Sequence, residues 1–463
     1  MSNDKYNIEG YNVHLIFYQI GRIICPSILR KIENSSILSR LVKGAFWSFI
    51  GNIVSKGCVL TASIFVARIL GKSVYGEFGI IQSTIGMFSV FAGFGLGQTA
   101  TKHVAELKKN DPERAGRIIG LSRLVTFISG GVIALIFFIF APWIATNTIN
   151  APHLIKELRI SSLVLFFSAI NGSQTGALAG FEAFKTIANV NVIIGLLTFP
   201  MLYIGAYLGG ITGTVWALLL NVILNCVLNY IALKRNAKCW SIKIRTIGWN
   251  RELNVLWKFS MPMLLCSVMV APTEWICRTF IVNQPNGYAQ MGLFNAANQW
   301  YTMLLFIPNV FAIALLPIIS EQFKKKQLNS ILKASTFSIK INTIISIPII
   351  VVTSMFSSLI MQLYGDDFSE GWPVLVVSVF TAGLIVIQTP LSQLVFASGM
   401  VWLGFAMNCI WATVYIISSF SFSEYGALGL SIARCISHII QLISLITFTV
   451  YFARVKSFAQ LKI

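Results

Sequence analysis

Twelve long apolar segments follow one another along the 463-residue chain, and each approaches or exceeds the about 20 residues that an α-helix needs to cross a bilayer. In hydrocarbon the backbone must satisfy its own hydrogen bonds, which long helices do and short open strands do not. The sequence therefore predicts an all-α polytopic membrane protein. The expected spans are 44–70, 75–97, 119–141, 158–179, 188–208, 211–233, 257–282, 288–318, 335–362, 372–397, 402–422 and 425–452.

Charged residues are too scarce to cover the surface of a soluble protein of this size. They make up 11% of the chain, against 56% hydrophobic residues, whereas soluble domains carry about 25% charged residues. This balance excludes a soluble enzyme and a disordered chain.

The basic residues predict the orientation in the membrane. The chain carries 35 Lys and Arg against 16 Asp and Glu, a net charge of +19. If the N-terminus is inside, 26 of the basic residues fall in cytoplasmic segments and 3 in external loops. The positive-inside rule then predicts that both termini are cytoplasmic. Because these basic loops face anionic lipid headgroups, the charge requires no nucleic-acid partner.

The longest internal cytoplasmic loop, 234–258, divides the spans six and six. A weak repeat supports this division, since Tyr75-Gly-Glu-Phe-Gly79 begins the second span and Tyr288-Ala-Gln-Met-Gly292 the eighth. We expect two six-helix lobes around a central cavity, as in transporters that work by alternating access. The expected segments are an N-terminal extension 1–43 (an interfacial helix or a loose tail), an N-lobe 44–233, a basic linker 234–256, a C-lobe 257–452 and a tail 453–463.

Catalytic signatures are missing from the sequence. It has no complete Walker A motif, no H-E-x-x-H and no G-x-S-x-G, and its large loops are too short for a catalytic domain. The eight cysteines occur singly, mostly in apolar runs, without metal-ligand spacing. We therefore expect no enzyme activity, no cofactor, no metal site and no disulfide framework.

Ionisable residues inside spans are costly, so each one is a candidate functional residue. Lys56 lies near the middle of the first span, with Asn52 and Ser63 close to the same helical face. A polar stripe around a cation favours a wet lumen. The alternative is a lysine bonded to carbonyls within the bundle.

Five further ionisable residues are candidates. Glu274 and Arg278 are spaced i,i+4 and predict an internal ion pair, which could also act as a gate or an ion-coupling site. Arg434 and His438 share a face of the last span. Two interpretations stay open for them, a role in the lumen and bonding to neighbouring helices. Arg123, near a cytoplasmic span end, either snorkels to the headgroups or attracts an anion at the inner mouth.

The spans together carry more positive than negative charge, because six Lys and Arg lie within them against Glu77, Glu274 and Glu182 near a span end. A cavity lined in this way attracts anions, and arginine suits phosphate. The inside-negative potential favours an anion leaving the cell by about 2.3 kcal/mol per charge per 100 mV. Near the first external turn, we expect Arg68 and Glu77 to form a salt bridge within the hairpin.

Several motifs carry a family resemblance. Ala67-Arg-Ile-Leu-Gly-Lys-Ser-Val-Tyr-Gly-Glu-Phe-Gly79, the loop 105–115 and Leu363-Tyr-Gly-Asp-Asp-Phe368 occur in the order typical of one family. The chain resembles the Wzx-type polysaccharide biosynthesis flippases of the multidrug/oligosaccharidyl-lipid/polysaccharide exporter superfamily. The resemblance covers about 44–452.

This resemblance implies transport of an undecaprenyl-pyrophosphate-linked oligosaccharide repeat unit, of O-antigen or a similar polysaccharide, to the outer leaflet of the bacterial inner membrane. It implies that cationic lumen residues hold the anionic headgroup, with Lys56 as the best match, followed by Arg278, Arg434 and Arg123. Membrane lipids, a polysaccharide polymerase and a chain-length regulator are the partners it suggests.

Two alternatives stay open. The first is a cation-coupled multidrug exporter of the same superfamily, but such proteins carry an acidic residue in the first span, where this chain has Lys56. The second is a non-transporting scaffold of the polysaccharide assembly machinery, against which the polar face of the first span argues.

Overall fold

The protein is built from long helices, as the sequence predicts. The structure, a computed structural model, describes residues 36–244, 268–306, 328–397 and 400–460. The expected extension 1–43 therefore lies mostly outside the described residues, as does the linker from residue 245 onward. The helices are α3 (Ser36–Gly93), α4 (Leu96–Leu107), α5 (Pro112–Trp143), α6 (Ile155–Gly180), α7 (Phe184–Cys239), α10 (Val270–Val282), α11 (Gly287–Leu304), α13 (Leu328–Met355), α14 (Ser357–Gln362), α15 (Trp372–Ala397), α16 (Val401–Ser421) and α17 (Gly426–Gln460).

The predicted spans correspond to these helices, which confirms the all-helical polytopic fold. Within the described residues, seven helices are long and apolar enough to cross a membrane. Two of them, α3 and α7, each contain two predicted spans that join at glycines. The shorter helices α10 and α11 hold the described parts of the predicted spans 257–282 and 288–318.

Glycines turn α3 and α7 back on themselves. Gly71 in α3 has a φ of 76° and Gly210 in α7 a φ of 54°, which side chains with a Cβ rarely adopt. The two arms of α7 then pack without side chains between them, since a Cβ on Gly213 would overlap the carbonyl oxygen of Gly205. Small residues at such crossings let membrane helices approach closely.

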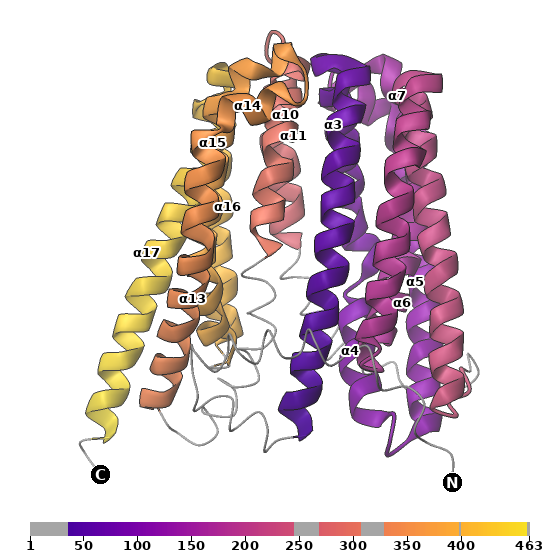
Figure 1. Ribbon diagram of the computed structural model, residues 1–463, viewed down its shortest axis with the longest axis vertical. Coiled ribbons are helices and arrows are strands. Elements are labelled where there is room, and N and C mark those ends of the chain that lie inside the picture. Colours follow the sequence, from indigo (N-terminus) through magenta and orange to yellow (C-terminus); the bar gives the residue numbers. More distant parts are fainter. Residues whose placement is uncertain (1–35, 245–267, 307–327, 398–399, 461–463) are drawn as a thin grey trace.

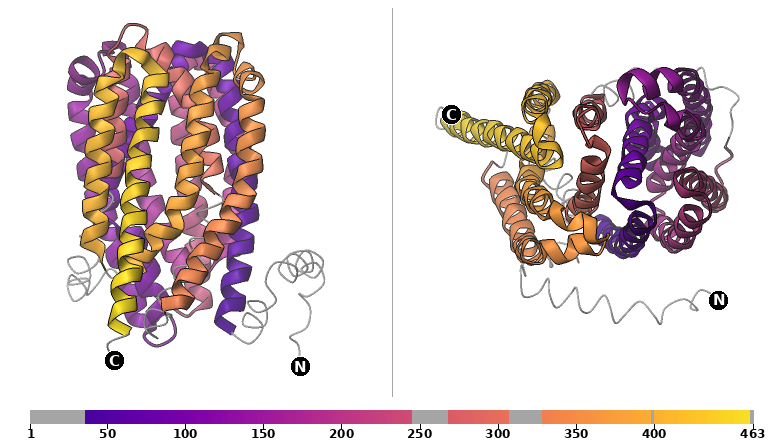
Figure 2. Two further views of the ribbon diagram at one scale, coloured as in Figure 1. Left: turned by 90° about the vertical axis from the view of Figure 1, so that its left-hand side faces the viewer. Right: turned by 90° about the horizontal axis from the view of Figure 1, so that it is seen from above.

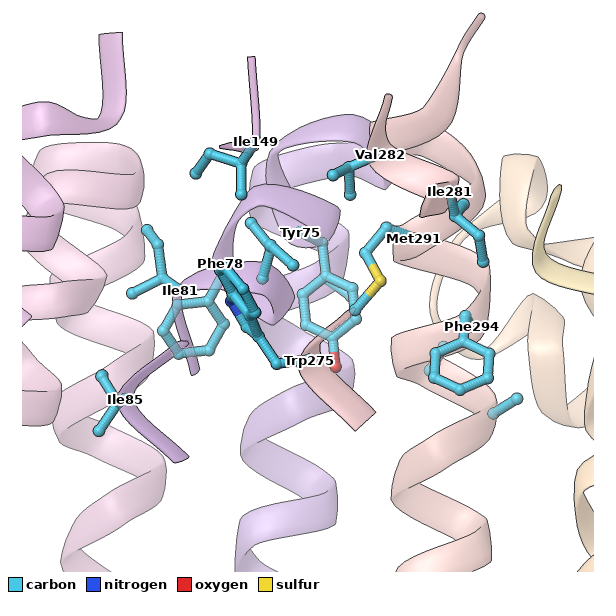
Figure 3. Packing of buried hydrophobic residues seen from close by; sticks show 14 of the residues in the cluster. Tyr75, Phe78, Ile81, Ile85, Ile149, Trp275, Ile281, Val282, Met291 and Phe294 are labelled. Carbon is cyan, nitrogen blue, oxygen red and sulfur yellow. The ribbon is translucent and has the colours of Figure 1, made fainter. Parts of the chain in front are cut away.

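The helices form two lobes (Figure 1, Figure 2). The N-lobe contains α3 to α7 and the C-lobe contains α10 to α17. We call the end of the bundle where α3 and α7 turn back the hairpin end. Helix α14 also lies there, whereas α3 begins and α17 ends at the opposite end (Figure 1). Both lobes contribute to one buried apolar cluster, which Figure 3 shows around Tyr75, Phe78, Trp275 and Met291.

The α7 hairpin provides a test of this close packing. We expect Gly213→Ala to lower the free energy of unfolding by about 1–3 kcal/mol, because an added methyl group forces the two arms apart. Gly209→Ala is the matched control, since a Cβ there meets nothing within 4 Å. Thermal unfolding of the detergent-purified variants measures the difference. Equal melting temperatures for the two variants would contradict the packing described.

Candidate functional site

The lobes meet along a seam at the hairpin end, and glycines form its closest contacts. A Cβ on Gly76 of α3 would overlap the carbonyl oxygen of Tyr288, at the start of α11. A Cβ on Gly292 would overlap the carbonyl oxygen of Lys72. These residues belong to or adjoin the repeated motifs of the sequence, 75–79 and 288–292. The corresponding segments of the two halves therefore pack directly against each other.

Polar side chains add specific bonds across this seam. Trp275 of α10 lies in the apolar cluster (Figure 3), and its Nε1 donates a hydrogen bond of 2.9 Å to Thr84 Oγ1 of α3. The Lys72 ammonium lies 2.6 Å from Glu370 Oε1, in η5 (Asp366–Gly371) of the C-lobe. The hairpin end is thus closed by apolar packing, close backbone contact and an ion pair.

The predicted hairpin salt bridge between Arg68 and Glu77 is wrong. Arg68 Nε instead donates a 2.5 Å hydrogen bond to the carbonyl oxygen of Leu363, in the C-lobe. Glu77 lies 2.9 Å from His153 Nε2. The break in helical geometry at Gly71 separates the two side chains, so that Arg68 contributes to the seam.

Beyond the seam, α3 carries the predicted polar stripe on the side that faces the C-lobe. Ser63 shares a 2.5 Å hydrogen bond with Tyr75 OH, and the Tyr75 ring packs 6.0 Å from Phe368 of the C-lobe. Viewed down the helix axis, Lys56 and Asn52 project within about 20° of Ser63, because residues 7 or 11 positions apart lie on nearly the same face of an α-helix.

Lys56 is an exposed cation without an ion pair or hydrogen bond to the described residues. It lies 15 residues before the turn at Gly71, which places it about 22 Å from the hairpin end along the helix axis. Asn52, half-buried, also has no hydrogen-bond partner in the described part of the chain. The polar stripe therefore carries side chains without hydrogen-bond partners in the described residues, at membrane depth and on the same side of α3 as Ser63.

A second group of candidates lies inside the C-lobe. Glu274 Oε2 is 3.3 Å from Arg278 Nη2, which confirms the predicted ion pair. The same oxygen is 2.9 Å from Arg434 Nη2, from α17. The side chain of Arg434 is 1% exposed and that of Arg278 13%. One carboxylate thus holds two guanidinium groups in the interior of the lobe.

Helix α11 completes the surroundings of Arg434. Its guanidinium carbon lies 4.6 Å from the centre of the Phe294 ring and 4.7 Å from that of Tyr301, and Nη1 donates a 3.0 Å hydrogen bond to Asn298 Oδ1. Cation–π contacts of this kind stabilise a desolvated charge. Sequence reasoning missed the two aromatic residues, although the spacing 294, 298 and 301 marks one helical face.

His438 lies one turn after Arg434 and is also buried. Its Nδ1 is 3.1 Å from Gln388 Oε1, and its backbone carbonyl accepts a hydrogen bond from Gln388 Nε2. The Trp411 ring packs 5.6 Å away. Among the described residues, no three His, Cys, Asp or Glu side chains are placed to hold a metal ion.

Arg123 belongs to neither group. It lies on α5, and its guanidinium carbon is 5.2 Å from the centre of the Tyr230 ring of α7. Both residues line a cavity between α5, α6 and the last turns of α7. The structure thus separates the predicted cations into three places: Lys56 on the seam side of α3, Arg278 and Arg434 in the C-lobe, and Arg123 in the N-lobe.

Comparison with known proteins gives both a family and a fold. The family described as "Polysaccharide biosynthesis protein" matches residues 65–373. The EPS I polysaccharide export inner membrane protein EpsE of Ralstonia nicotianae is 24% identical over 406 residues, which cover 85% of this chain and 91% of that protein. The Lipid III flippase of Escherichia coli (strain K12) is 23% identical over 290 residues, 62% of this chain and 69% of the flippase.

Solved structures of the MOP superfamily share the fold. A multidrug resistance MATE family transporter in its inward-facing conformation matches with a TM-score of 0.72 at 14% identity, over 88% of this chain and 99% of that one. A MOP superfamily transporter from Pyrococcus furiosus, described as having a binding pocket of reverse polarity, matches with a TM-score of 0.66 at 16% identity, over 90% and 95%. At these identities the likeness establishes the fold alone.

The glycine contact at the seam can be tested by adding one methyl group. We expect Gly76→Ala to hold the lobes apart at the hairpin end, because the new Cβ would overlap the Tyr288 carbonyl. Gly86→Ala, on the same helix but with nothing within 4 Å of its Cβ, is the control. Spin labels on cysteines introduced at Leu208 and Tyr425, in a variant without native cysteines, report the distance between the lobes. An unchanged distance in Gly76→Ala would refute this account of the seam.

The C-lobe cluster makes a separate prediction about stability. Glu274→Gln keeps the shape of the side chain but leaves two arginines without their shared counter-charge. Removing one partner of a buried ion pair costs about 3–5 kcal/mol, and we expect a loss of this size in the free energy of unfolding. The exposed Glu424→Gln serves as control. If denaturant unfolding in detergent gives the same midpoint for both variants, the cluster does not stabilise the lobe.

Proposed function

This chain belongs to the polysaccharide biosynthesis protein family, and we propose that it flips an undecaprenyl-pyrophosphate-linked oligosaccharide repeat unit to the outer leaflet of the bacterial inner membrane. It is a multi-pass membrane transporter of the polysaccharide export type and not an enzyme. The names of two relatives, a polysaccharide export protein and a Lipid III flippase, support export of a glycan that is linked to a lipid.

The observation that carries this proposal is the position of Lys56. An unpaired cation at membrane depth is costly unless it meets water or an anion. Helical periodicity directs Lys56 to the same side of α3 as Ser63, and it has no counter-ion in the described residues. We propose that the pyrophosphate of the lipid-linked substrate binds there while the polyprenyl tail stays in the bilayer, with Asn52 and Ser63 as polar neighbours.

The C-lobe cluster is proposed to act beside Lys56. Arg434 is fully buried and paired with Glu274, so we assign it to hold α10, α11 and α17 together around the site. Arg278 is the more exposed arginine, and its Nε has no hydrogen-bond partner in the described residues. We therefore propose that Arg278 contacts the headgroup, and that Glu274 and His438 act as a gate or an ion-coupling pair.

We propose that the seam contacts hold one closed state of an alternating-access cycle. We propose that the hairpin end faces outward, as the bias of 26 to 3 basic residues indicates. The lobes are then joined at the outer side, and the substrate enters from the cytoplasmic leaflet. Release outward requires that the Gly76 and Gly292 contacts and the Lys72–Glu370 pair separate, a rigid-body movement of one lobe against the other.

A cation-coupled multidrug exporter is the rival function that the fold allows. Transporters that bind cationic drugs need negative charge in the lumen. The first span of this chain, 44–70, contains Lys56 and no Asp or Glu. The sign of the charge on the seam side of α3 therefore favours an anionic substrate.

Replacing Lys56 tests the proposal directly. We expect Lys56→Gln to slow transport about tenfold or more, because a hydrogen bond to a charged group contributes about 1.5–3 kcal/mol and about 1.4 kcal/mol is a factor of ten in rate. Lys56→Arg should retain most of the activity. The measurement is the amount of lipid-linked repeat unit on each leaflet in cells without another flippase.

Lys340→Gln, an exposed cation on α13, is the control for general loss of charge. Surface polysaccharide at the normal level with Lys56→Gln, at equal protein abundance, would rule out the proposed substrate site.

A further inference from the structure

The N-lobe contains a basic cavity that the proposed transport path does not use. It has a volume of about 720 Å³ and lies between α5, α6 and the end of α7. Binding cavities for small ligands range from about 300 to 1,000 Å³. Four cations line this cavity, and none of the described residues that line it is acidic. The cations are Arg123, Lys234, Lys238 and Lys243.

The fold holds these cations in place from two sides. Arg123 reaches from α5 and lies over the Tyr230 ring of α7. Lys234 and Lys238 follow on α7 one turn apart, on the same face. The backbone of Lys243 packs directly on α5, since a Cβ on Gly116 would overlap its carbonyl oxygen. Four like charges around one cavity repel one another, and an anion between them would remove that repulsion.

The inner wall of the cavity, otherwise apolar, has a polar and buried part. Ser122, Ser173 and Gln174 line it and are 3%, 6% and 7% exposed. The Gln174 amide donates to Cys226 Sγ, but its Oε1 has no hydrogen-bond partner in the described part of the chain. A buried acceptor without a partner is costly, and a ligand hydroxyl would satisfy it if the amide, which is covered in this structure, turned toward the cavity. The wall thus suits a ligand that carries hydroxyl groups as well as negative charge.

The surface beside the cavity is apolar and exposed. Phe127, one turn after Arg123, is 58% exposed, and Val227, one turn before Tyr230, is 47% exposed. Exposed apolar side chains on a membrane-spanning helix face acyl chains. The cations therefore lie where the apolar surface of the N-lobe ends, at the level expected for lipid headgroups.

From this combination we propose that the cavity binds the phosphate group of a membrane lipid whose headgroup carries hydroxyls, at a site distinct from Lys56. The cations hold the phosphate, Gln174 accepts from a hydroxyl, and the acyl or prenyl chain lies along Phe127 and Val227. Two lipids share this chemistry: phosphatidylglycerol of the bilayer and the polyprenyl-pyrophosphate-linked substrate itself. Binding of phosphatidylglycerol would not depend on the proposed transport function, whereas binding of the substrate rests on it.

The test measures lipid binding to the purified full-length protein by native mass spectrometry. The probes are phosphatidylglycerol, undecaprenyl pyrophosphate and zwitterionic phosphatidylcholine. We expect the double substitution K234Q/K238Q to weaken binding of an anionic lipid at least about tenfold, because each basic residue near the headgroups contributes about fivefold. Arg123→Gln provides a second, independent variant on the opposite wall.

Arg235→Gln is the matched control, since Arg235 is exposed on the same helix at the same depth but does not line the cavity. If the cavity variants bind only phosphatidylglycerol more weakly, the cavity is a site for bulk anionic lipid. If the cavity variants bind only undecaprenyl pyrophosphate more weakly, the cavity is a site for the substrate before it reaches Lys56. If both probes bind the cavity variants as tightly as they bind Arg235→Gln, the proposal is overturned, whatever the outcome of the transport assay.

Discussion

A charge within a bilayer must be paired, reach the headgroups or face a polar space, and this constraint organises the whole molecule. Three of the predicted cations lie in different environments of the fold. Arg434 is paired with Glu274 and enclosed by aromatic rings. Arg123 lines a basic cavity between α5, α6 and the end of α7. Lys56 has neither a partner nor an enclosure in the described residues, which makes its position the strongest functional signal in the chain.

The fold was largely predictable because each helix that crosses a membrane requires a long apolar segment in the sequence. The spans follow from local hydropathy, and the helices confirm them. Pairings across the fold do not follow in this way. Glu274 and Arg434 are 160 residues apart, so α10 and α17 must pack before their contact exists. The spacing of Glu274 and Arg278 revealed only the pair within one helix.

Local spacing also misled where a glycine redirects the chain. Arg68 and Glu77 are close in sequence, but the rotation at Gly71 is not encoded by helical periodicity, and Arg68 reaches Leu363 instead. The basic cavity could not be predicted from the sequence for a related reason. Lys234 and Lys238 resemble ordinary cytoplasmic charges until α5 brings Arg123 to the same space.

Helix α3 carries both the seam contact at Gly76 and the candidate site residue Lys56 in one continuous element. Its second arm carries Gly76, which seals the hairpin end, and its first arm carries Lys56, about 22 Å away along the axis. If the two arms of α3 move as one rigid body, a movement at the seam is transmitted along the helix to Lys56. Any tilt that separates the lobes at the seam then also moves Lys56, the residue that we propose binds the substrate, so that the two ends of the transport path would change together.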